Sequence, residues 1–209
     1  MGRHQQDPFV EGGVFHLYNK VSTEAQLFRE PEDYEEFLQK FAKYFEPYFH
    51  FLSYALIPNH FHFVVQVKEI SPDFLRKEGS VTAQKLLKNT ISVDQFLTTV
   101  ASRFFSSYVM RYNNKYGRSG PLFKSGFKRV QQRSLIKMMY IIAYSHHNAL
   151  HHGLAESFGD HPYDSYRAIL SASPTKIARH LVLELFGGKE LFLKYHEEFR
   201  KDWRKNRHP

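Results

Sequence analysis

The chain has 209 residues, with 29 lysines and arginines against 21 acidic residues, and a formal net charge of +8. This length fits one domain that can bury a core without disulfides or metals. The absence of cysteine excludes disulfides, thiolate metal sites and cysteine nucleophiles, and it is what we expect of a cytoplasmic protein. The sequence has no run of about 18 apolar residues, so it predicts no membrane span. The polar first residues lack the apolar core of a signal peptide.

The positive charge is concentrated in one segment of the chain. Residues 95–155 contain no aspartate or glutamate, and basic side chains are interleaved there with aromatic ones. This composition predicts a nucleic-acid partner, because cations contact phosphates and aromatic rings stack on unpaired bases. An ordinary solvated surface over an aromatic core would have the same composition. The cations expected to contact DNA are Arg103, Arg111, Lys115, Arg118, Lys124, Lys128, Arg129 and Arg133.

The first half of the chain predicts a strand, a helix and a hairpin. Residues 14–21 alternate and are rich in β-branched and aromatic side chains, as in a strand. Residues 31–47 predict a helix, because apolar side chains recur every three or four positions between two prolines. Residues 50–57 and 60–68 predict two strands joined by a proline–asparagine turn. Residues 69–90 are less regular and predict a loop with a short helix.

The second half predicts mainly helices. A capping-box sequence at residues 92–95 precedes a helix that we expect to end near residue 116. Residues 122–131 predict a fourth strand that a glycine interrupts. A strongly apolar helix is expected from Ser134 to near Gly153, and two more helical stretches follow residue 174, broken by a pair of glycines.

The order of these elements predicts an α+β fold. Strand, helix, strand, strand, helix, strand and helix follow one another along the chain. This order fits an antiparallel sheet with helices on one face, the ferredoxin-like split βαβ arrangement. Helices at the C-terminus would be added to that unit.

Two histidines flank a phenylalanine in the predicted strand over residues 60–68. Side chains alternate between the faces of a strand, so His60 and His62 point the same way, about 7 Å apart. Phe61 points oppositely, into a core. Two imidazoles on one face can bind one divalent ion. Two unrelated histidines, in a chain that has 13, would give the same pattern.

Two tyrosines and an asparagine form a second pattern in the apolar helix. Tyr140, Tyr144 and Asn148 are spaced by four residues and therefore share one helical face. A phenol beside a metal-polarised phosphate can act as a nucleophile, and an asparagine carbonyl can complete the coordination of a hard cation. The same spacing fits two buried aromatic residues and a polar helix residue. Spacing alone does not choose between the two tyrosines.

Further short motifs accompany these residues in a fixed order. They are PNHFHFVV at 58–65, RY at 111–112, YGRSGPLFK at 116–124, GFK at 126–128, YI at 140–141, YSHHNAL at 144–150 and YDSY at 163–166. Together, over about residues 13–170, they resemble the single-tyrosine transposases of the histidine–hydrophobic–histidine (HUH) type. The resemblance is greatest to the branch associated with repetitive extragenic palindromes (REP).

The resemblance implies roles for four residues. Tyr144 matches the nucleophile, because Asn148 stands four residues after it. His60 and His62 match the pair that binds the metal, Mg²⁺ or Mn²⁺, and Asn148 matches the third ligand. Tyr140 remains a rival nucleophile about 6 Å along the same helix.

The chain departs from the branch at three positions, none of which carries a catalytic group. Ala149 stands where proline is usual, Ser145 where isoleucine is usual, and Tyr163 where tryptophan is usual. We therefore expect activity to be retained, with a sequence preference that the resemblance does not define. Residues 1–170 would form the single-tyrosine transposase-like catalytic domain, and residues 171–209 a C-terminal helical extension.

The implied function is that of a transposase. It would be a metal-dependent endonuclease and strand transferase on single-stranded, hairpin-flanked DNA, working as a monomer or homodimer through a 5′-phosphotyrosine intermediate. One alternative is a domesticated protein that binds DNA hairpins without cutting them. Another is a nickase of the replication or relaxase type, which the lack of a helicase domain disfavours. A metal hydrolase acting on other substrates is disfavoured by the acid-free basic segment.

Overall fold

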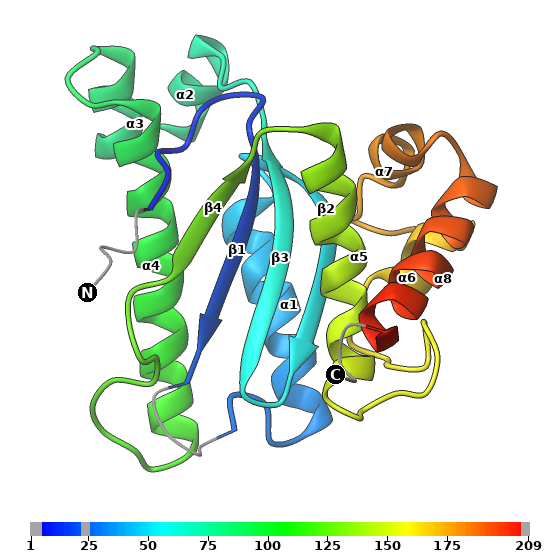
Figure 1. The fold of residues 1–209 in the computed structure, drawn as a ribbon. Helices are drawn as coiled ribbons and strands as arrows, with labels where there is room; N and C mark the ends of the chain where they lie inside the picture. The colour runs from blue at the N-terminus through cyan, green and yellow to red at the C-terminus, as the bar shows by residue number, and fades with distance from the viewer. Residues whose placement is uncertain (1–5, 22–25, 206–209) are drawn as a thin grey trace.

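The computed structural model describes residues 6–21 and 26–205 (Figure 1). Helix α1 (Pro31–Phe45) follows the first strand, and helix α4 (Val93–Lys115) precedes the last one. Neighbouring strands are all antiparallel, in the order β2-β3-β1-β4, which confirms the expected ferredoxin-like α+β sheet. The four strands are β1 (Val14–Lys20), β2 (Phe49–Ile57), β3 (His60–Val67) and β4 (Lys128–Gln132).

Helices α1 and α4 cover one face of this sheet with a core of phenylalanines. The ring of Phe63 on β3 stacks on Phe41 of α1 at 3.7 Å between centroids, and Phe61 lies 5.1 Å from Phe37. Phe104 of α4 packs edge-on against Phe41 at 5.4 Å. Each fully buried phenylalanine contributes about 1.5–3 kcal/mol to stability, so this layer fixes β3 and the direction of its alternate side chains.

Helix α5 (Leu135–His151) covers the opposite face, so the prediction of helices on one face holds for α1 and α4 but not for α5. Strand β2 is buried along nearly its whole length, which requires cover on both sides. A buried hydrogen bond of 2.9 Å joins the hydroxyls of Ser53 on β2 and Ser145 on α5. Helix α5 is thereby held across the sheet on the face to which His62 points.

The C-terminal residues form helices beside α5, as Figure 1 shows in orange and red. Helices α7 (Arg179–Phe186) and α8 (Lys189–Lys205) are separated by Gly187, whose φ of 78° ends α7, as the glycine pair predicts. The five-residue helix α6 (Tyr166–Leu170) is too short for its periodicity to be recognised in the sequence. Residues 206–209 of the predicted extension lie outside the described part of the chain.

The chain also covers the outer edge of β2. Single backbone bridges join Ala55 to Asp164 and Phe51 to Ile177. Both come from the segments that connect α5 to α7, so this edge of the sheet is occupied by the chain itself.

Two segments differ from the prediction. Residues 69–90 form two short helices, α2 (Pro72–Glu78) and α3 (Val81–Leu87), instead of a loop with one helix. Serine hydroxyls cap both, since Ser71 accepts a hydrogen bond from the Phe74 N–H and Ser80 one from the Ala83 N–H.

The fourth strand is shorter than predicted, because residues 122–127 are irregular. The backbone of this segment pairs with the sheet through an isolated bridge between Phe123 and Val21. Leu122 and Phe127 are buried there without strand pairing. Within the described residues, no helix has the length and apolar character needed to cross a bilayer.

Candidate functional site

A cavity of about 450 Å³ lies between the sheet and α5, beside the proposed metal pair. Strand pairing sets Tyr18 of β1 opposite His62 of β3, and Lys20 opposite His60. These four side chains therefore share one face of the sheet. Tyr144 of α5 also lines the cavity, with its ring edge-on to His62 at 5.7 Å between centroids.

His60 and His62 lie together, with ring centroids 5.0 Å apart and planes nearly perpendicular. The pKa of His60 is lowered to about 4, mainly by burial and further by the charges of His152, Lys20 and His151. A hydrogen bond with Asn148 raises this pKa and partly offsets the decrease. Burial and the neighbouring His16 hold the pKa of His62 well below its usual value. Both imidazoles are therefore neutral near pH 7, as metal coordination requires.

Asn148 connects the histidines to Tyr144. Its Nδ2 donates a hydrogen bond of 2.8 Å to the backbone carbonyl of Tyr144, one turn earlier on α5. Its side chain also interacts with His60 and with the Tyr144 phenol. Burial raises the pKa of that phenol, and the hydrogen bond with Asn148 partly offsets the rise. The structure thus brings His60, His62, Tyr144 and Asn148 into one cluster.

The donor atoms of this cluster fit a divalent ion. Nδ1 of His60 donates to Oδ1 of Asn59 at 2.6 Å, and Nδ1 of His62 lies 2.8 Å from Nε2 of His16. Both Nε2 atoms can then present a lone pair, since a metal-binding histidine uses its second nitrogen for an outer hydrogen bond. Within residues 6–21 and 26–205, no three histidine, aspartate or glutamate side chains are arranged to hold a metal. The resemblance gives Asn148 as the third ligand, and its amide carbonyl is an oxygen donor of the kind that hard cations accept.

His16 lies beside the cluster, although it belongs to none of the motifs that the resemblance uses. It lies on β1, is buried, and stacks on Tyr18 at 4.6 Å and on His62 at 5.0 Å. Burial lowers its pKa to about 3, so the ring is neutral near pH 7 and shares a hydrogen bond of 2.8 Å with His62. Alternation along residues 14–21 puts His16, Tyr18 and Lys20 on one face, and the pairing with β3 brings that face to His60 and His62.

The two tyrosines of α5 have different surroundings. Tyr144 is half-buried and contacts both His62 and His16, at 5.7 and 6.5 Å between ring centroids. Tyr140 is 47% exposed and contacts the Tyr144 ring at 6.3 Å and Phe199 of α8 at 5.3 Å. Tyr144 is therefore the tyrosine that lies against His62, one of the two proposed metal ligands.

Some of the predicted DNA-binding cations lie near the cluster. Lys128 on β4 is opposite Tyr18 and places its Nζ 5.7 Å from that ring centroid. The backbone N–H of Lys124 donates to the carbonyl of Lys20, at the end of the sheet where His60 lies. Arg118, in the loop after α4, instead packs over Tyr112 of α4, so its guanidinium lies against that helix. Lys20, which the prediction does not include, also belongs to this group.

Other predicted cations do not face the cluster. Arg103, Arg111 and Lys115 lie on α4, which packs on the phenylalanine face of the sheet. Arg111 is paired with Glu36, and Lys115 with Asp33 at 2.7 Å. These side chains could contact DNA only on a surface separate from the proposed catalytic cluster.

Arg129 corrects the prediction most clearly. Its side chain is 5% exposed, pairs with Asp94 at 2.8 Å and packs over the Phe9 ring at 4.4 Å. Strand alternation turns it to the side of the sheet opposite Lys128, so it is a buried ion pair and no part of a DNA surface. Arg133 is exposed but lies 3.2 Å from Asp7, which offsets its charge.

Comparison with known proteins finds similar chains among solved structures. No family model and no curated protein sequence matches the chain. Among solved structures, the REP-associated tyrosine transposase bound to a REP hairpin aligns with a TM-score of 0.56, over 83% of this chain and 89% of that chain. The two sequences are 13% identical, so this likeness shows the fold alone. The chain is thus similar in fold to a REP-associated tyrosine transposase, the branch that its sequence motifs resemble.

Proposed function

We propose that this protein is a DNA-cutting and DNA-joining transposase that uses Tyr144 as its nucleophile and acts on single-stranded DNA beside a hairpin. The observation that supports it best is the position of the Tyr144 phenol. It lies against His62, and Asn148 interacts with both this phenol and His60. A fold shared with a hairpin-bound tyrosine transposase agrees with this arrangement.

His60, His62 and Asn148 would hold a divalent ion, Mg²⁺ or Mn²⁺. When bound, the ion would supply the Lewis acidity that polarises the scissile phosphate. The neutral state of both imidazoles makes their Nε2 lone pairs available, and His16 fixes the orientation of His62. These residues would therefore place a phosphate within reach of the Tyr144 oxygen.

Tyr144 would attack phosphorus directly. The phenolic oxygen forms a bond to phosphorus and releases its proton, while the bond from phosphorus to the 3′-oxygen breaks and that oxygen takes up a proton. The products are a 5′-phosphotyrosine link and a free 3′-hydroxyl. Attack by a 3′-hydroxyl on this link reverses the step and rejoins strands without ATP.

One chain would supply the whole catalytic set. Tyr144 contacts His62 of the same chain, at 5.7 Å between ring centroids, so no second copy is needed to bring the nucleophile to the metal. A monomer is thus sufficient for cleavage. Lys20, Lys124 and Lys128 would hold the DNA backbone at this end of the sheet, and exposed Tyr140 could stack on an unpaired base.

The test uses a labelled DNA hairpin with a single-stranded flank, incubated with Mg²⁺ or Mn²⁺ and resolved on a denaturing gel. We expect a covalent protein–DNA adduct that EDTA abolishes, that Tyr144→Phe eliminates, and that Tyr140→Phe retains. His60→Ala and His62→Ala should each remove the adduct and weaken Mn²⁺ binding measured by calorimetry.

Other results would favour the alternatives. Tight hairpin binding without any adduct identifies a domesticated, non-cutting protein. Cleavage of a replication origin or transfer origin without rejoining at hairpins identifies a nickase. An adduct mapped by mass spectrometry to Tyr140 refutes the proposed nucleophile.

A further inference from the structure

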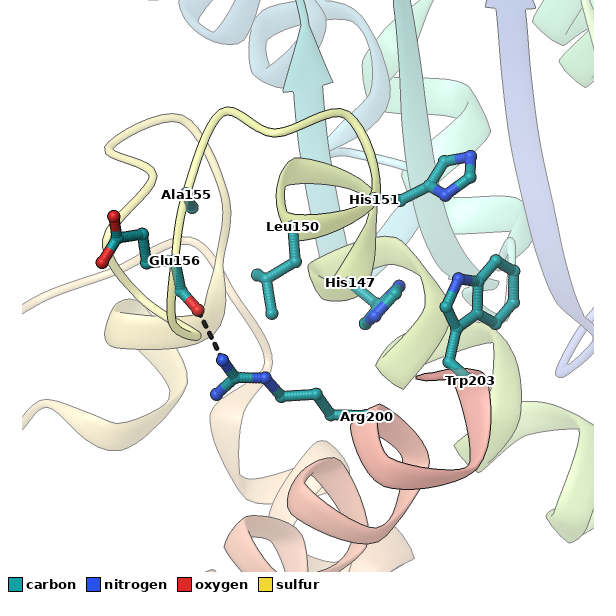
Figure 2. A pocket seen from close by; sticks show the side chains of 7 residues that line it. All are labelled: His147, Leu150, His151, Ala155, Glu156, Arg200 and Trp203. Atoms are coloured by element: carbon teal, nitrogen blue, oxygen red, sulfur yellow. Dashed lines mark hydrogen bonds between the residues drawn. The ribbon is translucent and has the colours of Figure 1, made fainter. Parts of the chain in front are cut away.

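A second cavity, of about 420 Å³, lies between the end of α5, the loop over residues 153–160 and α8 (Figure 2). His147 and His151 of α5 form one wall, and Arg200 and Trp203 of α8 form another. Its volume is in the range of about 300–1,000 Å³ that is usual for small-molecule sites. The proposed reaction makes no use of this cavity.

Arg200 makes the cavity a candidate anion site. Its Nη2 donates a hydrogen bond of 2.7 Å to the backbone carbonyl of Glu156, which fixes the guanidinium in place (Figure 2). Its Nε is buried and has no hydrogen-bond partner. A buried donor without a partner is unfavourable, and an anionic oxygen is the acceptor that best satisfies a guanidinium.

The remaining wall is compatible with a phosphate. Glu156 contributes its backbone to the cavity, and its exposed carboxylate is turned away from Arg200 (Figure 2). The other wall residues are the aromatic rings of His147, His151 and Trp203 and two small or apolar side chains. A single fixed cation surrounded by aromatic rings suits a nucleotide, whose phosphate is anionic and whose base is flat.

Trp203 links this cavity to the proposed nucleophile. Its ring lies 5.9 Å from that of Tyr144, and 5.0 and 5.6 Å from those of His147 and His151. One side chain therefore contacts both the attacking tyrosine and the second cavity. We therefore expect a DNA strand with one phosphate at Tyr144 to continue toward this cavity.

We propose that this cavity binds one nucleotide of the single strand next to the phosphate that Tyr144 attacks, and that Arg200 is the cation for its phosphate. This inference rests on the proposed function for the identity of the strand. The group that Arg200 would recognise is a phosphate monoester or diester. The experiment below distinguishes binding of inorganic phosphate from binding of DNA.

Trp203 is the single tryptophan of the chain, so its fluorescence reports directly on the cavity. The probes are inorganic phosphate, a deoxynucleoside 5′-monophosphate and a short single-stranded flank attached to a hairpin, each titrated into the Tyr144→Phe protein, which is not expected to cleave. We expect a saturable change with the nucleotide and the flanked hairpin, and a weaker one with phosphate. Arg200→Gln should weaken both by roughly 10- to 100-fold, as for loss of a charged hydrogen bond.

Lys201→Gln is the matched control, because it removes the same charge from the next, exposed residue of α8. It should change the affinities by less than about threefold. Leu150→Trp provides a test that leaves Arg200 in place, because the larger side chain fills the cavity and should block nucleotide binding. Binding to this variant is measured by calorimetry, since the second tryptophan would obscure the fluorescence of Trp203. Arg200→Lys keeps the charge but not the planar fork, and should restore part of the affinity.

Equal effects of Arg200→Gln and Lys201→Gln would mean that general surface charge attracts DNA, which overturns the proposal. Equal affinity for phosphate and nucleotide would reduce the site to one for the free ion. If an adduct forms at Tyr144 but Arg200→Gln and Leu150→Trp leave DNA affinity unchanged, the cavity proposal alone is wrong. If Arg200-dependent nucleotide binding is present while no adduct forms, the proposed catalysis is wrong and the nucleotide site stands.

Discussion

Replacing His16 by phenylalanine tests how the candidate metal ligand His62 is oriented. The new ring keeps the shape of the stack on Tyr18 but removes Nε2, which lies 2.8 Å from Nδ1 of His62. That nitrogen of His62 is then buried without a partner. A lost hydrogen bond of this kind costs about 1–3 kcal/mol in the free energy of unfolding.

The same change should weaken metal binding. Removal of the group that orients a metal-binding histidine lowers metal affinity by about 10- to 100-fold. At about 1.4 kcal/mol per tenfold, this equals roughly 1.4–2.8 kcal/mol, which matches the cost of the missing hydrogen bond. His16→Gln retains an amide that can bond to His62 Nδ1, so it should recover part of both losses.

Urea denaturation and calorimetric titration with Mn²⁺ measure the two effects. His50→Phe is the control, because this histidine is on β2, is partly buried and does not contact His62. It should leave Mn²⁺ affinity unchanged. Unaltered Mn²⁺ affinity in His16→Phe, with affinity lost in His62→Ala, would refute the role assigned to His16.

Three further predictions concern a buried acid, the DNA surface and the second tyrosine. Burial raises the pKa of Asp164 to about 7, so between about pH 4 and 7 the proton leaves more readily from the unfolded chain, and stability falls as pH rises. Asp164→Asn should remove this pH dependence, measured by thermal denaturation, and should raise the free energy of unfolding by at most about 4 kcal/mol near pH 8. The same dependence of stability on pH in the variant and the parent protein would contradict this prediction. Lys124→Ala with Lys128→Ala should flatten the salt dependence of hairpin affinity in filter binding by about 0.7–0.9 per lost contact, while Arg103→Ala on the far face should not. Tyr140→Phe should form the adduct at a measurable rate on a denaturing gel.

The elements that depend on local pattern are those that the sequence predicts well. The hairpin over residues 49–67, the capping box at Ser92 and the common face of His60 and His62 follow from alternation, capping and turn signals within a few residues. These signals also place Tyr144 and Asn148 one turn apart on α5. The sequence therefore predicts which candidate catalytic residues share one face of the same strand or helix.

Relations between distant elements are not readable in this way. His16 and His62 are 46 residues apart in the chain, and their contact depends on the pairing of β1 with β3. Arg129 lies in the acid-free segment, yet its charge is buried against Asp94, because the pleat turns it away from Lys128. Charge counted along the chain cannot distinguish the two faces of a sheet.

The two bridges on the outer edge of β2 affect how this protein can associate. An open edge strand is a template for pairing with another chain, and proteins commonly cover such edges. Here Asp164 and Ile177 occupy backbone positions along β2, which hinders a neighbouring copy from extending the sheet on that side. The other edge, β4, is only five residues long and carries Lys128. Continuous intermolecular sheets are thus disfavoured at both edges of the sheet.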